Sequence, residues 1–169
     1  YVNSPQTKLF NKSKLLYGYQ IAKEHIYKKN QIIVCEGYLD VIMLHQAGFN
    51  TAVATLGTAL TADHLPLLRR GEPKVILAYD GDKAGLAAAF KASVMLSQSE
   101  FEGGVIIFAD GMDPADMVNK NKVEELNEIF ANPISFTAYA IDYIISKYDI
   151  NDANQKQKAL IESNEYLKS

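Results

Sequence analysis

The sequence predicts an α/β protein: a parallel sheet of about four strands sandwiched by helices, followed by a partial helical subdomain. Short apolar runs bounded by turn residues are typical of buried parallel strands. They alternate with helix-like stretches, which predicts right-handed crossovers that cover both faces of the sheet. From Val123 onward no strand pattern appears, so we expect only helices there.

The expected strands are residues 32–35, 51–54, 75–79 and 105–108. Before the first strand, residues 15–29 carry apolar side chains close to helical spacing. Residues 38–47 are expected to form a helix because Gly48 suits the position just after a helix end. Thr61 is a plausible N-cap for a helix over residues 61–70, which Pro66 could kink by removing a backbone donor.

In the second half, Asp82 is a natural N-cap for the alanine-rich residues 83–96. Asp113 starts another helix, with Pro114 at its first position. Further helices are expected over residues 123–130, 134–148 and 153–169. We therefore divide the chain into a basic lead-in and helix (residues 1–30), an α/β metal-binding domain (31–131) and a helical appendage (132–169). The appendage is expected to be truncated because its last helix runs to Ser169.

Composition excludes several classes of protein. Of the 169 residues, 48% are hydrophobic and 22% charged, as in soluble globular proteins. No apolar run is long enough to span a bilayer. The chain shows no signal peptide and begins with Tyr1, so we expect a piece of a longer cytoplasmic protein. The single cysteine, Cys35, excludes an intramolecular disulfide and a zinc cluster of several cysteines.

Acidic residues follow three of the expected strands. In parallel sheets, ligands bind beyond the carboxyl ends of the strands. Carboxylates that converge there repel one another unless a cation joins them. The sequence therefore predicts a divalent-metal site. Its candidate ligands are Glu36, Asp40, Asp80, Asp82, Asp113 and Asp116.

Most of these acids also have a structural explanation. Asp82 and Asp113 suit helix caps, and Asp40 lies where the helix dipole favours an acid. Asp116 completes a near-ideal helix start without any metal. Glu36 could bind metal, act as an acid or base with a raised pKa, or simply face solvent.

Basic and hydroxyl residues flank the acidic clusters. Before Glu36 there are six lysines against one acid, Glu24. This lead-in could hold a polyanion or could be a solvated helix face. Gly57, between Thr55 and Thr58, could expose backbone N–H groups to a phosphate.

At this point several ordered blocks resemble a known family. A strand that ends in Glu-Gly and a later strand that ends in Asp-x-Asp resemble the Toprim domain. The details are similar to the bacterial replicative primases of the DnaG family over about residues 1–120. The matching blocks are Val34-Cys35-Glu36-Gly37-Tyr38-Leu39-Asp40-Val41, Ala54-Thr55-Leu56-Gly57-Thr58-Ala59, Tyr79-Asp80-Gly81-Asp82-Lys83-Ala84-Gly85 and Gly111-Met112-Asp113-Pro114.

The resemblance implies a DNA-dependent RNA polymerase that makes short RNA primers by two-metal nucleotidyl transfer with Mg²⁺ or Mn²⁺. Glu36, Asp80 and Asp82 would be catalytic. Implied partners are a single-stranded DNA template, ribonucleoside triphosphates and the RNA primer, and a replicative helicase that binds through a domain absent here. No membrane partner is implied, and the setting is the cytoplasmic replisome.

The same resemblance implies nucleic-acid or nucleotide contacts. Lys12 matches a lysine on the family's nucleic-acid side, and Lys14, Thr58 and Lys83 are further candidates. Many relatives carry Asp-Pro-Asp where this chain has Ala115 after Pro114, so the ligand role of Asp116 stays open. We expect the fragment alone to prime poorly. Alternatives are a topoisomerase or nuclease Toprim domain and a RecR-like scaffold that binds DNA without turnover.

Overall fold

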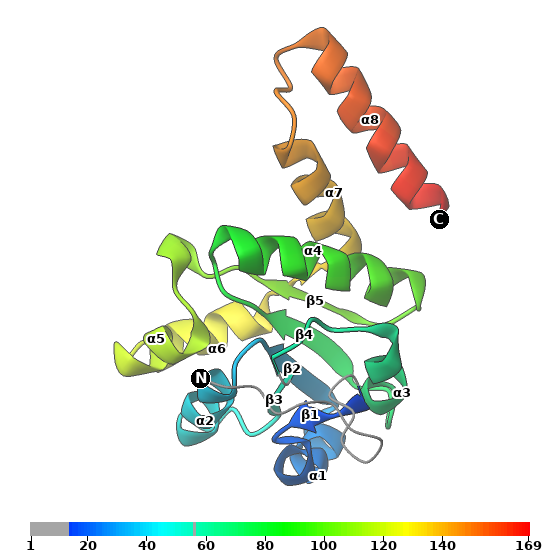
Figure 1. The fold of residues 1–169 in the computed structure, drawn as a ribbon. Helices are drawn as coiled ribbons and strands as arrows, with labels where there is room; N and C mark the ends of the chain where they lie inside the picture. The colour runs from blue at the N-terminus through cyan, green and yellow to red at the C-terminus, as the bar shows by residue number, and fades with distance from the viewer. Residues whose placement is uncertain (1–13, 56) are drawn as a thin grey trace.

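A computed structural model describes residues 14–55 and 57–169 and contains one six-stranded sheet (Figure 1). The strand order is β1-β3-β2-β4-β5-β6. The four inner strands are parallel, and both edge strands are antiparallel to their neighbours. The strands are β1 Leu16–Tyr17, β2 Gln31–Cys35, β3 Ala52–Thr55, β4 Lys74–Ala78, β5 Gly103–Ile106 and β6 Ile134–Ser135. The predicted class, a parallel sheet of about four strands covered by helices, is confirmed.

Helices cover both faces of this sheet. They are α1 Tyr19–Lys29, α2 Tyr38–Gln46, α3 Leu65–Leu68, α4 Lys83–Gln98, α5 Pro114–Asn119, α6 Val123–Ala131, α7 Phe136–Ser146 and α8 Ala153–Lys168, with short 3₁₀ turns η2 Ala62–His64 and η3 Ala109–Gly111. Buried side chains of α1, α3, α4 and α7 form one core with the sheet. Those of α2, α5 and α6, on the left in Figure 1, form the other.

The two edge strands were not predicted. Residues 15–29 do not form one helix, because Leu16–Tyr17 pairs with β3 and Gly18 turns the chain at φ 79° before α1 begins. The expectation of no strand after Val123 is also wrong, since Ile134–Ser135 pairs with β5. A two-residue strand has no periodicity of its own, and only its pairing with a neighbour defines it.

Pro66 divides the helix expected over residues 61–70. The segment instead forms η2 and then the four-residue α3. Thr61 is the N-cap as predicted, but its partner is a histidine: the backbone N–H of Thr61 donates to Nδ1 of the fully buried His64 at 3.1 Å. The loop after β3 is therefore anchored at its far end.

The order of the parallel strands places the site. The chain passes from β2 to the neighbour on one side, β3, and from β4 to the neighbour on the other side, β5. The direction of winding thus changes between β2 and β4, where a crevice forms beyond the carboxyl ends of the strands. Glu36 follows β2 and Asp80 follows β4.

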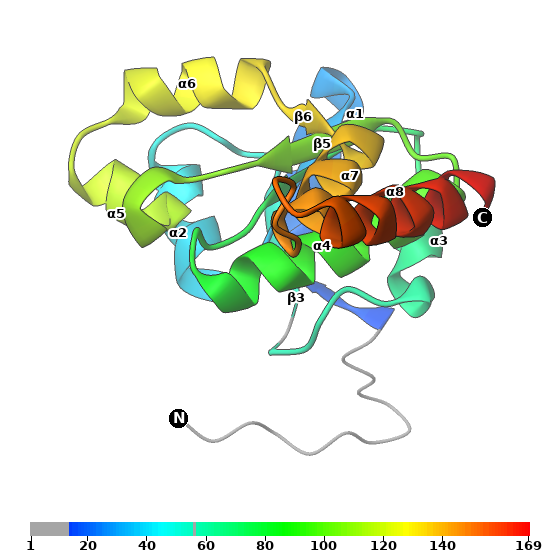
Figure 2. The same cartoon turned by 90° about the horizontal axis from the view of Figure 1, so that it is seen from above.

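Helices α7 and α8 extend from the sheet beside α4 (Figures 1 and 2). Phe90 of α4 stacks on Tyr143 of α7, with ring centroids 4.6 Å apart. Ser97 of α4 hydrogen-bonds Tyr166 of α8 at 2.8 Å. The proposed division between residues 131 and 132 stays a prediction. Within the described ranges, none of the helices combines the length and the apolar character that crossing a membrane requires.

Candidate active site

Glu36 and Asp80 carry unpartnered buried oxygens on either side of the crevice. Among the described residues, neither Oε1 of Glu36 nor Oδ1 of Asp80 has a hydrogen-bond partner. A buried acceptor without a donor is costly, and such groups in native proteins usually indicate a water, an ion or a functional role. A bound cation would satisfy both oxygens.

The electrostatics of the two groups point the same way. Burial, together with the charges of Asp80 and Asp82, raises the pKa of Glu36 to about 7, and a hydrogen bond from the backbone N–H of Asp80 opposes this shift. Burial also raises the pKa of Asp80, with Asp113 the next contributor. The fold therefore holds these carboxyl groups where negative charge is disfavoured, and a cation would reverse that.

Two glycines let the strand ends approach one another. A Cβ on Gly85 would lie 2.2 Å from the carbonyl oxygen of Asp80 and 3.0 Å from Oε1 of Glu36. A Cβ on Gly81 would lie 2.5 Å from the carbonyl oxygen of Phe108. The first turn of α4 and the segment after β5 thus pack directly against the acidic residues.

Asp82 is the N-cap of α4, as predicted. Its Oδ1 accepts a hydrogen bond from the backbone N–H of Gly85 at 2.7 Å. Its side chain is exposed, and its charge still contributes to the raised pKa of both Glu36 and Asp80. The cap therefore also contributes to the acidic cluster.

Asp40 joins two of the turns. It is buried in the first turn of α2, and its Oδ1 accepts the backbone N–H of Ala115 at 3.2 Å. Burial, with the charge of Asp113, raises its pKa to about 6. Asp40 thus connects the turn after β2 to the beginning of α5.

Asp113 and Asp116 form the predicted start of α5. The N–H of Asp116 donates to Oδ1 of Asp113 at 2.7 Å, and the N–H of Asp113 donates to Oδ2 of Asp116 at 3.4 Å. This is a capping box. Both charges raise the pKa of Asp80, so the box belongs to the same cluster. Whether either acid binds metal stays a prediction.

The six acids converge, but they do not form a ready-made metal cage. Over residues 14–55 and 57–169, no three His, Cys, Asp or Glu side chains are arranged to hold one ion. Several of the carboxylates accept helix-capping hydrogen bonds instead. The two unpartnered oxygens of Glu36 and Asp80 are what fits a cation here.

The basic and hydroxyl candidates that the structure describes lie near the same end of the strands. Lys14 is exposed and precedes β1, whose Leu16 pairs with the last residue of β3. Thr58 is exposed in the loop after β3, and Lys83 is exposed at the first position of α4. Lys12 lies outside the described residues.

A cavity of about 330 Å³ opens beside Glu36. Its walls come from the ends of β2, β3 and β4, the loop after β3 and the first turns of α4. It is lined by Glu36, Thr55, Gly57, Thr58, Ala59, Tyr79, Ala84 and Ala88. Tyr79 was not predicted as a site residue. Its position could have been inferred from the alternation of side chains along the strand.

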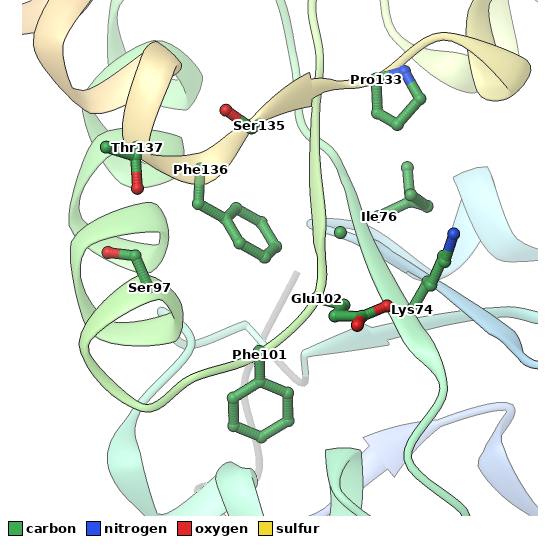
Figure 3. Close-up of a pocket in the computed structure, with 10 residues that line it drawn as sticks. Lys74, Ile76, Ser97, Phe101, Glu102, Pro133, Ser135, Phe136 and Thr137 are labelled. Carbon is green, nitrogen blue, oxygen red and sulfur yellow. The ribbon is translucent and has the colours of Figure 1, made fainter.

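A second cavity, of about 420 Å³, lies at the amino ends of the parallel strands, opposite the acidic residues at their carboxyl ends. Figure 3 shows the residues that line it. Lys74 and Gly103, the first residues of β4 and β5, line it with Phe101 and Phe136. None of the clustered carboxylates reaches it. It is therefore separate from the acidic site.

The chain is similar to known proteins over its whole length. Residues 30–107 match the Toprim domain model. A DNA primase of Helicobacter pylori strain J99 is 55% identical over 169 residues, which are 100% of this chain and 30% of that protein.

Two solved structures have a similar fold. A DNA primase domain from Pseudomonas aeruginosa has a TM-score of 0.86 at 29% identity, covering 99% of this chain and 54% of that one. The RNA polymerase domain of Mycobacterium tuberculosis primase DnaG, solved in complex with double-stranded DNA, has a TM-score of 0.78 at 37% identity, covering 98% and 54%. The chain thus spans about 30% of the length of its curated relative.

Proposed function

The chain belongs to the bacterial DNA primase family and carries its Toprim domain, and from this premise we propose that its acidic edge is the catalytic centre for RNA primer synthesis. The reaction is nucleotidyl transfer on a single-stranded DNA template. The 3′-oxygen of the growing strand bonds to the α-phosphorus of a ribonucleoside triphosphate, the bond to the β-phosphate oxygen breaks, and pyrophosphate leaves.

The observation that carries this proposal is the pair of unpartnered buried oxygens, Glu36 Oε1 and Asp80 Oδ1, at the switch between β2 and β4. Their geometry supports a bound Mg²⁺ or Mn²⁺ between the strand ends, with Asp82 beside them. Asp40, Asp113 and Asp116 are proposed as the surrounding acidic set. Bound divalent cations supply activation of the attacking hydroxyl and neutralisation of the triphosphate.

Glu36 has the proton-transfer role in this proposal. A general base must lie within reach of the proton that it accepts, and Oε1 of Glu36 has no hydrogen-bond partner among the described residues. Glu36 would accept the proton that leaves the 3′-hydroxyl. Asp80, whose charge interacts with Asp82 and Asp113, would hold the opposite side of the reacting centre.

Nucleic acid would approach from the side that bears Lys14, Thr58 and Lys83, and Lys12 is proposed as a further phosphate contact. Lysines neutralise phosphates by charge without reading sequence. The DNA complex of the Mycobacterium relative supports a nucleic-acid partner. We further propose that the whole protein works at the cytoplasmic replisome with a replicative helicase. The similarity to primases does not favour the topoisomerase, nuclease or RecR-like alternatives.

A charge-removal series tests the proposal in the intact primase that contains this chain. Asp80→Asn and Glu36→Gln keep side-chain size but remove the charge, and we expect each to lower metal-dependent ribonucleotide incorporation at least about a hundredfold. The matched control is Asp142→Asn, on an exposed position of α7, which should retain activity. Full primer synthesis by either site variant would contradict the assignment.

A further inference from the structure

We propose that the cavity beside Glu36, called here the Tyr79 pocket, binds the 3′-terminal ribose of the growing strand, with the Tyr79 hydroxyl recognising the 2′-hydroxyl. The Tyr79 pocket is the cavity of about 330 Å³ lined by Glu36, Tyr79 and six further residues between the loop after β3 and α4. The inference rests on the proposed nucleotidyl transfer and names the sugar that this site would select.

Three strands direct their polar residues into this pocket from one face of the sheet. Val75, Leu77 and Tyr79 belong to the core under α4, as does Val34. Alternation along the strands places Glu36 on the same side as Val34. The pocket thus continues the α4 face of the sheet outward from the core to the carboxylates.

Tyr79 contributes a polar hydroxyl group to the lining of this pocket. Its side chain is only 4% exposed and lines the pocket, and its hydroxyl is not one of the fully buried unpartnered atoms of the described residues, which fits a hydroxyl that opens into the pocket. Buried tyrosine hydroxyls usually have a partner. A tyrosine hydroxyl is protonated at neutral pH and can donate a hydrogen bond.

The chemistry of the walls favours a neutral sugar over a phosphate. Over residues 14–55 and 57–169, no lysine, arginine or histidine lines the pocket, and the one charged lining residue is the acidic Glu36. A phosphate there would be repelled. The hydroxyls of Thr55, Thr58 and Tyr79 and the carboxylate of Glu36 suit the vicinal hydroxyls of ribose.

Size and position agree with a terminal sugar. The volume corresponds to about ten water molecules at roughly 30 Å³ each, enough for a furanose ring and its hydroxyls. If the attacking 3′-oxygen lies at Glu36, the 2′-hydroxyl on the neighbouring carbon must lie close by. The pocket extends from Glu36 to Tyr79, so the 2′-hydroxyl of the terminal ribose would lie within it.

The test compares two template-annealed primers that differ only in whether the last sugar is ribose or 2′-deoxyribose. In the intact primase, we expect kcat/KM for adding one ribonucleotide to be about tenfold higher on the ribose end, the value of one net hydrogen bond. Tyr79→Phe, which removes only the hydroxyl, should bring this ratio close to one. Tyr27→Phe, on an exposed residue of α1, should retain it.

A binding measurement separates this inference from the proposed function. Fluorescence anisotropy with Ca²⁺, without turnover, should show the same ribose preference and its loss in Tyr79→Phe. If neither the unmodified primase nor Tyr79→Phe extends either primer, but Tyr79→Phe loses the preference for binding the ribose-ended primer, the proposed primer synthesis is contradicted and the ribose assignment of the pocket is supported. If primers are extended with no preference at the terminal sugar, the pocket assignment is overturned and primer synthesis stands.

A second variant fills the pocket. Ala88→Leu adds bulk from α4 and should weaken binding of the ribose-ended primer about tenfold or more, at an unchanged melting temperature. Normal affinity in the folded Ala88→Leu protein would also overturn the inference.

Discussion

The carboxyl groups of Glu36 and Asp80 are held where their ionised forms are disfavoured, and this has a measurable consequence. A carboxyl whose pKa is raised on folding binds its proton more tightly in the native state than in the unfolded chain. The stability that this provides is complete below the ordinary pKa of 4.5 and is lost as the pH rises through about 7, the folded value for Glu36.

We therefore expect the metal-free protein to lose thermal stability between about pH 4.5 and about pH 7. The change should be modest, because Glu36 is only half-buried and solvent screens its charge. Adding Mg²⁺ at about pH 8 should restore the melting temperature, since a cation reverses the penalty. Circular-dichroism melts across this range measure it.

Two variants give this pH prediction its controls. Glu36→Gln should flatten the loss of stability with pH, whereas Asp142→Asn should leave it unchanged. A melting temperature that rises between about pH 5 and about pH 7 without metal would contradict the prediction.

The sequence predicted which acidic residues lie at the strand ends, but not the hydrogen bonds that they make or the pocket that they border. The sequence predicted that Glu36, Asp80 and Asp82 would meet at one sheet edge, because parallel strands share a carboxyl end. It could not show that Asp40 would accept a hydrogen bond from Ala115, which is 75 residues away in the chain. Tyr79 was not predicted to line a pocket, as it does, although the alternation of side chains along its strand could have indicated that position.

At the scale of single elements, Asp113 at the beginning of α5 has two roles. Asp113 caps the helix through its Oδ1 and also interacts electrostatically with Asp80. Asparagine caps a helix about as well as aspartate but carries no charge. The two roles can therefore be measured independently.

We expect Asp113→Ala to lower the free energy of unfolding by about 1 kcal/mol, because the cap is lost. Asp113→Asn should retain most of that stability. If Asp113 is a ligand, both variants should weaken Mn²⁺ binding in a titration, Asp113→Ala at least as much as Asp113→Asn, which keeps a neutral oxygen ligand. Urea denaturation measures the stability, and equal destabilisation by both variants would refute the capping role.

Long elements were predictable and short ones were not. Helices with strong caps, such as α4 after Asp82 and α5 after Asp113, begin at the predicted residues. The two-residue strands β1 and β6 exist only through pairing with β3 and β5. The interruption at Pro66 was expected as a kink, but the local sequence did not reveal that His64 would accept a hydrogen bond from the backbone N–H of the N-cap Thr61.

At the scale of the whole molecule, topology brings the acids together. The sheet winds outward in both directions from β2 and β4, so the loops after these two strands border one crevice. The alternation of strands and helices predicted this class of sheet, but the order of strands came only from the structure. Helices α7 and α8 pack along α4, the helix that Asp82 caps: Tyr139 of α7 donates to the carbonyl oxygen of Leu86, and Tyr166 of α8 hydrogen-bonds Ser97.

The position of the metal is the central claim, and Mn²⁺ can locate it directly. Crystals of this chain soaked in Mn²⁺ should show anomalous peaks bonded to Glu36 and Asp80, with Asp82 beside them. Whether a peak also touches Asp116 would separate its ligand role from its helix-capping role. Peaks absent from this cluster, or found only elsewhere on the molecule, would contradict the account.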